Sequence, residues 1–160
     1  MSRAVKVAIG VALVGAVVSL ARRLGDYSEH GDHGDSEDVL RAYYEAWSSG
    51  DADGVRDLLA EGYTGHVHTL SGTDDQDAKT VAARIKSHQS AFDHVEYEVE
   101  DVVSRNGEAA ARLTMRARHR ETGKNAKTTG LSILRIEDGR IAEEWSSWDY
   151  HGLAAQLGLE

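Results

Sequence analysis

Cysteine and proline are both missing from this 160-residue chain. Without cysteine, disulfides, thiol catalysis and thiolate metal sites are excluded, although the redox compartment stays open. Without proline, the turns have to be made by glycine, asparagine and aspartate. Lysine is scarce, with 5 against 13 arginines, and 27 acidic residues outnumber 18 basic ones, which gives a formal net charge of -9. Because phosphate binding requires a basic surface, we expect no nucleic-acid partner.

The acidic excess has two explanations. Self-repulsion of this size is tolerable in concentrated salt, where the Debye length falls to ~3 Å at 1 M, and this favours a halophilic source. An ordinary acidic soluble domain is the alternative. The apolar fraction of 41% is sufficient for one packed domain in a chain of this length.

A hydrophobic segment stands near the start of the chain. Residues 4–21 (AVKVAIGVALVGAVVSLA) contain one charge, Lys6, and Arg22-Arg23 follow them directly. The uncharged part is 15 residues long, whereas about 20 are needed to span hydrocarbon. Because the flanking basic side chains can extend to the interface and no small-x-small cleavage site precedes the arginine pair, we predict a membrane anchor. A cleaved signal sequence and a buried or peripheral helix are the alternatives, so the protein is expected to be membrane-anchored, on an undetermined side, or exported.

Residues 25–35 (GDYSEHGDHGD) are polar and rich in glycine, and they show no apolar periodicity. This composition predicts a flexible linker. His30 and His33 lie among aspartates and could bind a metal ion, but a tract of this kind is more often only a spacer. We therefore divide the chain into a hydrophobic segment (1–24), a linker (25–35) and a folded domain (36–160).

Apolar residues recur at helical spacing in the first half of the domain. Asp35 or Ser36 is a suitable N-cap for the first helix, and Gly50 and Gly62 are expected to end the first two helices. The predicted helices cover residues 36–49, 53–61 and 77–91.

The hydrophobic period then changes to two, which is typical of strands with one buried face. Asn106-Gly107 and Asp138-Gly139 are strong hairpin-turn sequences. The alternation predicts strands over residues 94–100, 111–119, 127–136 and 141–148, with a short helix over 150–157. Helices first and a meander afterwards indicate an α+β fold, with helices on one face of a curved, mostly antiparallel sheet.

The most specific stretch is Ile133–Gly158 (ILRIEDGRIAEEWSSWDYHGLAAQLG). It closely resembles the SnoaL-like pattern of a strand, an Asp-Gly turn, I-x-E-x-W, an aspartate four residues after the tryptophan, and a closing Q-L-G. The matching positions here are Asp138-Gly139, Ile141, Glu143 or Glu144, Trp145, Asp149 and Gln156-Leu157-Gly158. Upstream, YYEAWSSGDADGVRDLLAEGY resembles the opening helix pair of the same proteins. The domain is therefore similar to SnoaL-like members of the nuclear transport factor 2 superfamily, the branch of polyketide cyclases and ester cyclases.

This resemblance implies a cone-shaped α+β barrel, in which helices pack on a curved sheet and enclose a cavity. In the cyclases of the family, an aspartate acts as acid/base on a carbonyl-bearing polyketide, a histidine lies nearby, and neither metal nor cofactor is used. Other relatives only bind small molecules. The resemblance thus implies no cofactor and no metal here, and a small apolar or carbonyl-bearing molecule as the partner.

Asp149 is the first candidate catalytic residue. It lies in phase with Ile141 and Trp145 if the last strand alternates regularly, which would place it beside apolar surface as a base for a proton next to a carbonyl. Spacing alone favours the alternative, in which Asp149 caps the final helix. The family resemblance favours the catalytic role, so Asp149 is our predicted base.

His119 is the second candidate. It shares strand parity with Leu113 and Met115 and should therefore face the apolar side of the sheet. A histidine in that place can polarise a carbonyl or move a proton near neutral pH. A hydrogen-bonded core histidine, or one at a solvated strand end, is the alternative.

His66 and His68 fall on one face of an extended segment and are candidate accessory groups in the same chemistry. Two imidazoles in this pattern can also hold a metal ion, but they do not make a site without a third ligand. Histidines exposed on the surface are the remaining alternative.

Ligand-binding positions follow from the same reasoning. Trp145 could stack on a flat ligand if it lines the cavity. Core or dimer contacts are the simpler alternative for the aromatic residues. The residues expected to line the cavity are Trp145, Tyr44, Trp47, Leu113 and Met115.

Three functions stay open at this point. The first is a cofactor-independent cyclase or isomerase that transfers protons on a carbonyl compound. The second is a non-catalytic domain, tethered at the membrane, whose cavity binds a small molecule. The third is a domain whose exposed sheet forms a homodimer. The enzyme requires a carboxylate inside the cavity, whereas the other two do not.

Overall fold

The computed structural model describes residues 33–159, with side chains from residue 36 onward. No helix in this range is long and apolar enough to cross a membrane, and the apolar run 4–21 lies outside it. The helices are α2 (His33–Ser49), α3 (Ala52–Leu58), α4 (Ala78–Ala91) and α5 (Tyr150–Leu157). The strands are β1 (Leu59–Thr69), β2 (Gly72–Gln76), β3 (Phe92–Arg105), β4 (Glu108–His119), β5 (Asn125–Glu137) and β6 (Arg140–Trp148).

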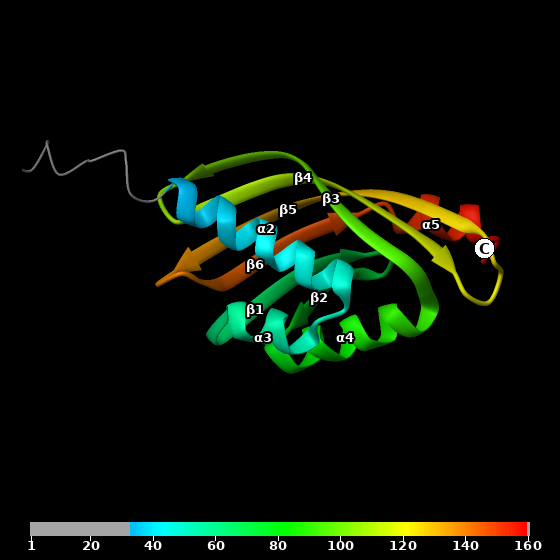
Figure 1. Cartoon of the computed structure of the whole chain (residues 1–160), viewed down its shortest axis with the longest axis horizontal. Coiled ribbons are helices and arrows are strands. Elements are labelled where there is room, and N and C mark those ends of the chain that lie inside the picture. The colour runs from blue at the N-terminus through cyan, green and yellow to red at the C-terminus, as the bar shows by residue number, and fades with distance from the viewer. Residues whose placement is uncertain (1–32, 160) are drawn as a thin grey trace, which may run out of the picture. The chain divides into compact units, whose positions relative to one another are not determined.

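The strands form one sheet in the order β2-β1-β6-β5-β4-β3. Neighbours are antiparallel except β1 and β6, which run parallel. β2 and β3 lie at the two edges, so the sheet is curved but open, without closing into a full barrel. Figure 1 shows α2, α3 and α4 on the same side of this sheet and α5 at one end of it. The predicted α+β class, with helices on a curved and mostly antiparallel sheet, is confirmed.

The helix α2 presents one apolar stripe to the sheet. Leu40, Tyr43, Tyr44 and Trp47 follow the i, i+3, i+4, i+7 spacing, and all four are buried. The helix starts at His33, two residues before the first predicted cap, and the chain leaves it through Gly50 at φ 73°. This stripe forms the floor of the core and, farther along, one wall of the functional site.

Two features of the β1 region differ from the sequence prediction. The second helix ends at Leu58, and the strand β1 begins at Leu59 instead of after Gly62. Gly62 lies within the strand at φ 81°, where the register between β1 and β6 shifts, so its positive φ serves an irregular strand and not a helix end. The strand β2 (GTDDQ) was not predicted, because four of its five residues are exposed and it has no apolar alternation.

The long hairpins follow the prediction at their turns. Asn106-Gly107 and Asp138-Gly139 all have positive φ, between 50° and 77°, as a two-residue hairpin turn requires. β4 pairs with β5 without a register shift, and its inner face carries the predicted alternation, including Leu113, Met115 and His119.

A β-bulge changes the phase of β6. Ile141 pairs with Ile136 and Glu143 pairs with Arg135, so Ala142 has no partner of its own on β5. Beyond this extra residue, the side chains that face inward are those of Glu144 and Ser146, both buried. The prediction that Trp145 and Asp149 continue the phase of Ile141 is therefore wrong.

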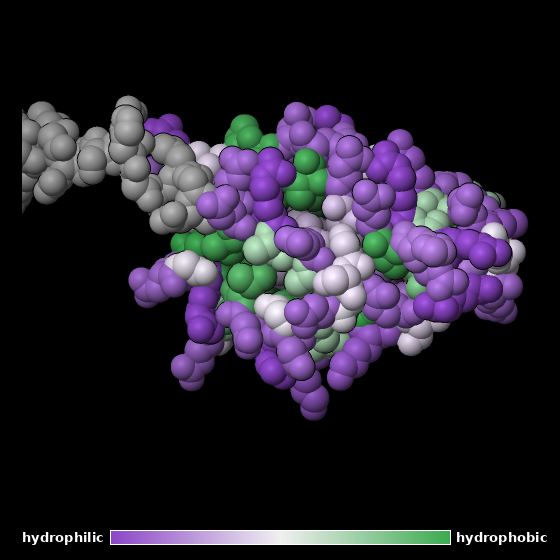
Figure 2. Space-filling model, in the orientation of Figure 1, coloured by the Kyte–Doolittle hydropathy of each residue, from purple (hydrophilic) through white to green (hydrophobic). Residues whose placement is uncertain are grey.

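The outer face of the sheet is covered with charged side chains. Arg112, Arg116 and Arg135 form salt bridges with acidic residues on their own or neighbouring strands. Hydrophilic residues also dominate the helical side of the domain, as Figure 2 shows. The outer face also carries exposed apolar side chains, with Val103 73%, Leu131 61% and Ile133 45% exposed.

Candidate functional site

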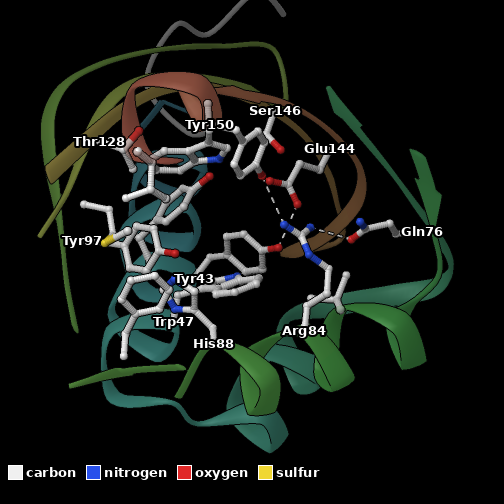
Figure 3. Close-up of a pocket in the computed structure, with 16 residues that line it drawn as sticks. Tyr43, Trp47, Gln76, Arg84, His88, Tyr97, Thr128, Glu144, Ser146 and Tyr150 are labelled. Carbon is white, nitrogen blue, oxygen red and sulfur yellow. Dashed lines mark hydrogen bonds between the residues drawn. The ribbon is translucent and has the colours of Figure 1, made fainter. Parts of the chain in front are cut away.

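A cavity of about 190 Å³ lies between α2, α4, α5 and the inner face of the sheet. Seven of its sixteen lining residues are aromatic. A cluster of polar side chains lies beside them at one end of the cavity, as Figure 3 shows. The lining residues are Tyr43, Tyr44, Trp47, Gln76, Val81, Arg84, His88, Phe92, Tyr97, Met115, Thr128, Glu144, Ser146, Trp148, Tyr150 and Leu153.

Trp148 forms one wall because the facing strand has no side chain there. Gly130 pairs with Trp148, and a Cβ on this glycine would lie 2.5 Å from the indole ring. The indole therefore lies directly against the backbone of β5. Its ring also packs edge-on against Tyr97, with centroids 5.5 Å apart, so the wall is rigid and flat.

Glu144 is the acidic group of the cavity. Its side chain is 6% exposed, and Oε2 accepts hydrogen bonds of 2.8 Å from the hydroxyls of Tyr43 and Tyr63. Both hydrogen bonds that the described residues donate to this carboxylate end on the same oxygen. Oε1 accepts no hydrogen bond from the described residues, while the two tyrosines hold Oε2 in place.

The two tyrosines remain proton donors at neutral pH. Burial, followed by the charge of Glu144, raises the pKa of Tyr43 well above its ordinary value. The same two causes raise the pKa of Tyr63. Tyr43 comes from α2 and Tyr63 from β1, so two different elements fix the position of the Glu144 carboxylate.

Arg84 provides the positive charge of the site. Its Nη1 donates to Gln76 Oε1 at 2.8 Å, and its Nη2 lies 3.4 Å from the hydroxyl of Tyr150. The guanidinium carbon lies 5.8 Å from the centre of the Trp47 ring, within reach of a cation–π interaction. Both hydrogen-bond partners are neutral, and Arg84 forms no salt bridge with a carboxylate of residues 36–159.

Three further polar atoms at the cavity are buried without a partner. They are the Tyr44 hydroxyl, Trp47 Nε1 and His88 Nδ1, none of which has a hydrogen bond within the described part of the chain. Burial, with a smaller contribution from the Arg84 charge, lowers the pKa of His88 to about 4. His88 is therefore neutral at physiological pH. Buried polar groups are normally satisfied, so these atoms indicate a place for polar ligand atoms or water.

The structure brings three of the five predicted ligand-binding residues to the cavity. Tyr44, Trp47 and Met115 line it. Leu113 is fully buried in the adjoining core instead. Trp145 points to the outer face because of the bulge at Ala142, and its ring stacks on His66 with centroids 5.5 Å apart.

The predicted base and its histidine lie outside this cavity. Asp149 is the N-cap of α5, and its Oδ1 accepts a hydrogen bond of 2.8 Å from the Gly152 amide. This is the capping arrangement that the spacing favoured. His119 is 8% exposed and faces the inner side, as its parity predicted, but its Nδ1 lies 3.0 Å from the Thr122 hydroxyl in the turn after β4. The structure therefore does not bring Asp149 and His119 together at the lining of the cavity.

His66 and His68 share the outer face of β1. His66 contacts Asp75 through Nδ1 at 2.7 Å and Glu143 through Nε2 at 3.0 Å, and these two hydrogen bonds raise the pKa of His66. His68 Nδ1 lies 3.3 Å from the Thr73 hydroxyl. No group of three or more His, Asp or Glu residues within residues 33–159 is arranged to hold a metal ion.

Sequence reasoning missed the residues that carry charge into the cavity. Glu144 was named only as an alternative to Glu143. The bulge decides which of the two faces inward, and it leaves no mark in the hydrophobic pattern of the sequence. Arg84 lies on an amphipathic helix, between Val81 and Ile85 in the sequence. An arginine at such a position is normally expected to face the solvent. Nothing in the sequence pattern indicated a role for Tyr63, because the second helix was expected to end beside it, at Gly62.

Comparisons with known proteins agree with the fold. The family model of the SnoaL-like polyketide cyclases matches residues 37–157. IdmH of Streptomyces antibioticus, provisionally named a polyketide cyclase, is 28% identical with a TM-score of 0.70, and the match covers 77% of this chain and 98% of IdmH. No curated protein sequence matches the chain.

More distant structures share the fold. A protein of Bacillus cereus, also provisionally named a polyketide cyclase, is 22% identical with a TM-score of 0.69, covering 78% of this chain and 81% of that one. An epoxide hydrolase of M. tuberculosis is 13% identical with a TM-score of 0.63, covering 78% and 90%. Because the family model matches well over half of its residues, the chain belongs to the SnoaL-like polyketide cyclase family.

Proposed function

We propose that the domain is a cofactor-independent cyclase or isomerase that transfers a proton on a small carbonyl compound, with Glu144 as the acid/base group. The observation that supports this most directly is the buried carboxylate itself. Glu144 lies in an aromatic cavity, with one oxygen held by two tyrosine hydroxyls and the other available to a ligand. A carboxylate in this setting is suited to proton transfer at a carbon next to a carbonyl.

The proposed step balances without a further reactant. Oε1 of Glu144 removes a proton from the carbon next to the carbonyl, so the C–H bond breaks and an O–H bond forms. The electron pair moves onto the carbonyl oxygen and gives an enolate. In an isomerisation, Glu144 returns the proton to another carbon of the same conjugated system. In a cyclisation, the enolate carbon attacks a second carbonyl of the same molecule, and Glu144 returns its proton to the alkoxide oxygen that forms.

The tyrosines support this role by positioning the carboxylate. Tyr43 and Tyr63 both donate to Oε2, so the carboxylate plane is held while Oε1 stays accessible. Positioning of this kind lowers the barrier because the reacting atoms need no reorganisation. The aromatic walls would exclude water and hold a flat substrate.

Asp149 stays the competing assignment, because the family resemblance predicts it as the base. Its carboxylate would have to leave the Gly152 amide and turn toward the cavity. His119, His66 and His68 would then have to act from outside the lining as well. The two assignments predict opposite results for two conservative substitutions.

The experiment measures turnover of single-ring enolisable ketones by wild type, Glu144→Gln and Asp149→Asn. Glutamine can still accept hydrogen bonds from the two tyrosines but cannot take a proton, so we expect Glu144→Gln to lose activity by at least about 10²–10⁴-fold. Asparagine is as good an N-cap as aspartate, so Asp149→Asn should keep both stability and turnover.

Circular dichroism and urea unfolding of both variants serve as folding controls. Full activity of Glu144→Gln would overturn the assignment, and loss of activity in Asp149→Asn with the fold intact would restore Asp149 as the base. Ligands that bind all three proteins equally and are never converted would support a non-catalytic binding domain instead.

A further inference from the structure

Arg84 is a cationic side chain that lines the inner cavity and has no carboxylate partner among residues 36–159. Arg112, Arg116 and Arg135 on the sheet each have carboxylate partners. Arg84 has two neutral partners instead, a glutamine carbonyl and a tyrosine hydroxyl. A partly buried guanidinium with five donors and no counter-ion has capacity for an anionic oxygen.

The guanidinium of Arg84 lies between two hollows of the domain. Gln76, Arg84 and Tyr150 line the inner cavity, and the same three residues line a wider outer hollow of about 790 Å³. They therefore form the neck between the two. Figure 3 shows Arg84 and Gln76 on the same side of the inner cavity as Glu144.

The size of the inner cavity limits the part of a ligand that can enter. Its volume is about 190 Å³, and an apolar cavity of about 150 Å³ accommodates benzene. One ring with a small substituent fits, whereas several fused rings do not. A longer substituent would have to pass the neck into the outer hollow.

We infer that Arg84 binds the anionic oxygen of a single-ring ligand, an enolate or a phenolate, at the neck, with the ring in the inner cavity. The ligand class is therefore a compact enolisable ketone or phenol, and any chain it carries extends into the outer hollow. The aromatic walls recognise the ring, and Arg84 recognises the charge on the oxygen.

The charges of the site suit the deprotonation of a neutral ketone. Before reaction, the site holds one positive charge on Arg84 and one negative charge on Glu144. When the proton moves to Glu144, the negative charge moves to the ligand oxygen beside Arg84, so the net charge of the site does not change.

This inference rests on the proposed function for the direction of proton transfer, but its test measures binding alone. The probe is 4-nitrophenol, whose phenolate absorbs visible light, and 4-nitroanisole is the neutral analogue of the same ring size. Wild type should bind the phenolate in preference to the neutral phenol, so the apparent pKa of the probe falls on binding. Arg84→Met should weaken phenolate binding about 10- to 100-fold and leave 4-nitroanisole unchanged.

Three variants make the result specific. Lys86→Met removes one positive charge from an exposed position of the same helix and should leave phenolate binding unchanged. Arg84→Lys retains the charge and should keep most of the preference for the phenolate. Glu144→Gln removes the neighbouring negative charge, so the phenolate should bind more tightly than to wild type.

The outcomes separate this inference from the proposed function. Equal phenolate affinity in wild type and Arg84→Met, with both proteins folded by circular dichroism, would overturn it. Binding of 4-nitroanisole as tightly as the phenolate would do the same, because only an apolar cavity would then be needed. If Glu144→Gln retains turnover while Arg84→Met loses the phenolate, the proposed base is wrong and the anion site stands.

Discussion

On the outer face of the sheet, charged side chains are satisfied by one another, whereas on the inner side they are not. Arg116 pairs with Glu98 across two strands, and Arg135 pairs with Glu143 in the same way. Inside, Glu144 is held by tyrosine hydroxyls, Arg84 contacts only neutral groups, and His88 Nδ1 is unpartnered within the described residues.

The two faces differ in what their charged groups contribute to stability. Exposed ion pairs contribute little to stability, so the outer network is best explained by solubility and by the alternation of the strands. A buried polar group without a partner is costly, so the inner groups are retained at the expense of stability. The inner side is therefore where ligand chemistry should be sought.

The largest effect should come from removing apolar volume on the inner side. Leu113 on β4 is fully buried, whereas Leu131 on the neighbouring strand is 61% exposed on the outer face. We expect Leu113→Ala to lower the free energy of unfolding by about 2–5 kcal/mol, and Leu131→Ala to change it by less than about 0.5 kcal/mol. Urea unfolding of both variants measures this, and equal losses would show that the outer face is also covered.

The next effect concerns the pH dependence of His88. Its pKa is about 4 in the folded protein and about 6.5 when unfolded, so the unfolded chain binds the proton first as the pH falls. Neutral His88 makes its full contribution to the free energy of unfolding above about pH 6.5. That contribution, up to about 3 kcal/mol, is lost as the pH falls from about 6.5 to 4.

Replacing the imidazole with a ring that does not titrate isolates this contribution. We expect His88→Phe to keep the aromatic packing and to lose less stability than wild type between pH 7 and pH 4.5. Urea unfolding at several pH values provides the comparison. Parallel pH profiles for the two proteins would mean that His88 is already solvated in the folded state.

The smallest effect should come from the outer ion pairs. Arg116 and Glu98 are each about half exposed, so Arg116→Gln should leave the urea midpoint unchanged, in low salt and in 1 M salt alike. A clear destabilisation that grows with protein concentration would contradict this. It would indicate that a second copy of the chain covers this face.

The sequence predicted the regular part of the fold and failed where regularity breaks. Leu113, Met115 and His119 were assigned to the inner face correctly, because β4 alternates without interruption against β5. Trp145 and Asp149 were assigned by the same rule and the rule failed, because Ala142 adds one residue to β6. The alternation of side chains predicts their facing only within a stretch of strand that has no bulge. The residue types do not reveal where a bulge lies.

The site was predictable only in its apolar part. Tyr44 and Trp47 follow from the stripe of α2, and Met115 follows from the parity of β4. Arg84 and Gln76 meet at the neck through tertiary contacts between α4 and an exposed strand with no pattern of its own. Neither residue type nor spacing predicts that contact.

The adjacent glutamates at positions 143 and 144 show how little separates a residue on the outer face from one that lines the cavity. Glu143 is partly exposed on the outer face, and its hydrogen bonds to His66 and the Arg135 guanidinium lower its pKa. Glu144, one residue later and chemically identical, is buried among tyrosines. If Ala142 paired with Arg135 instead of forming the bulge, Glu143, Trp145 and Ser147 would face the interior and Glu144 would face outward. One irregularity of the backbone therefore decides which of two identical side chains lines the cavity.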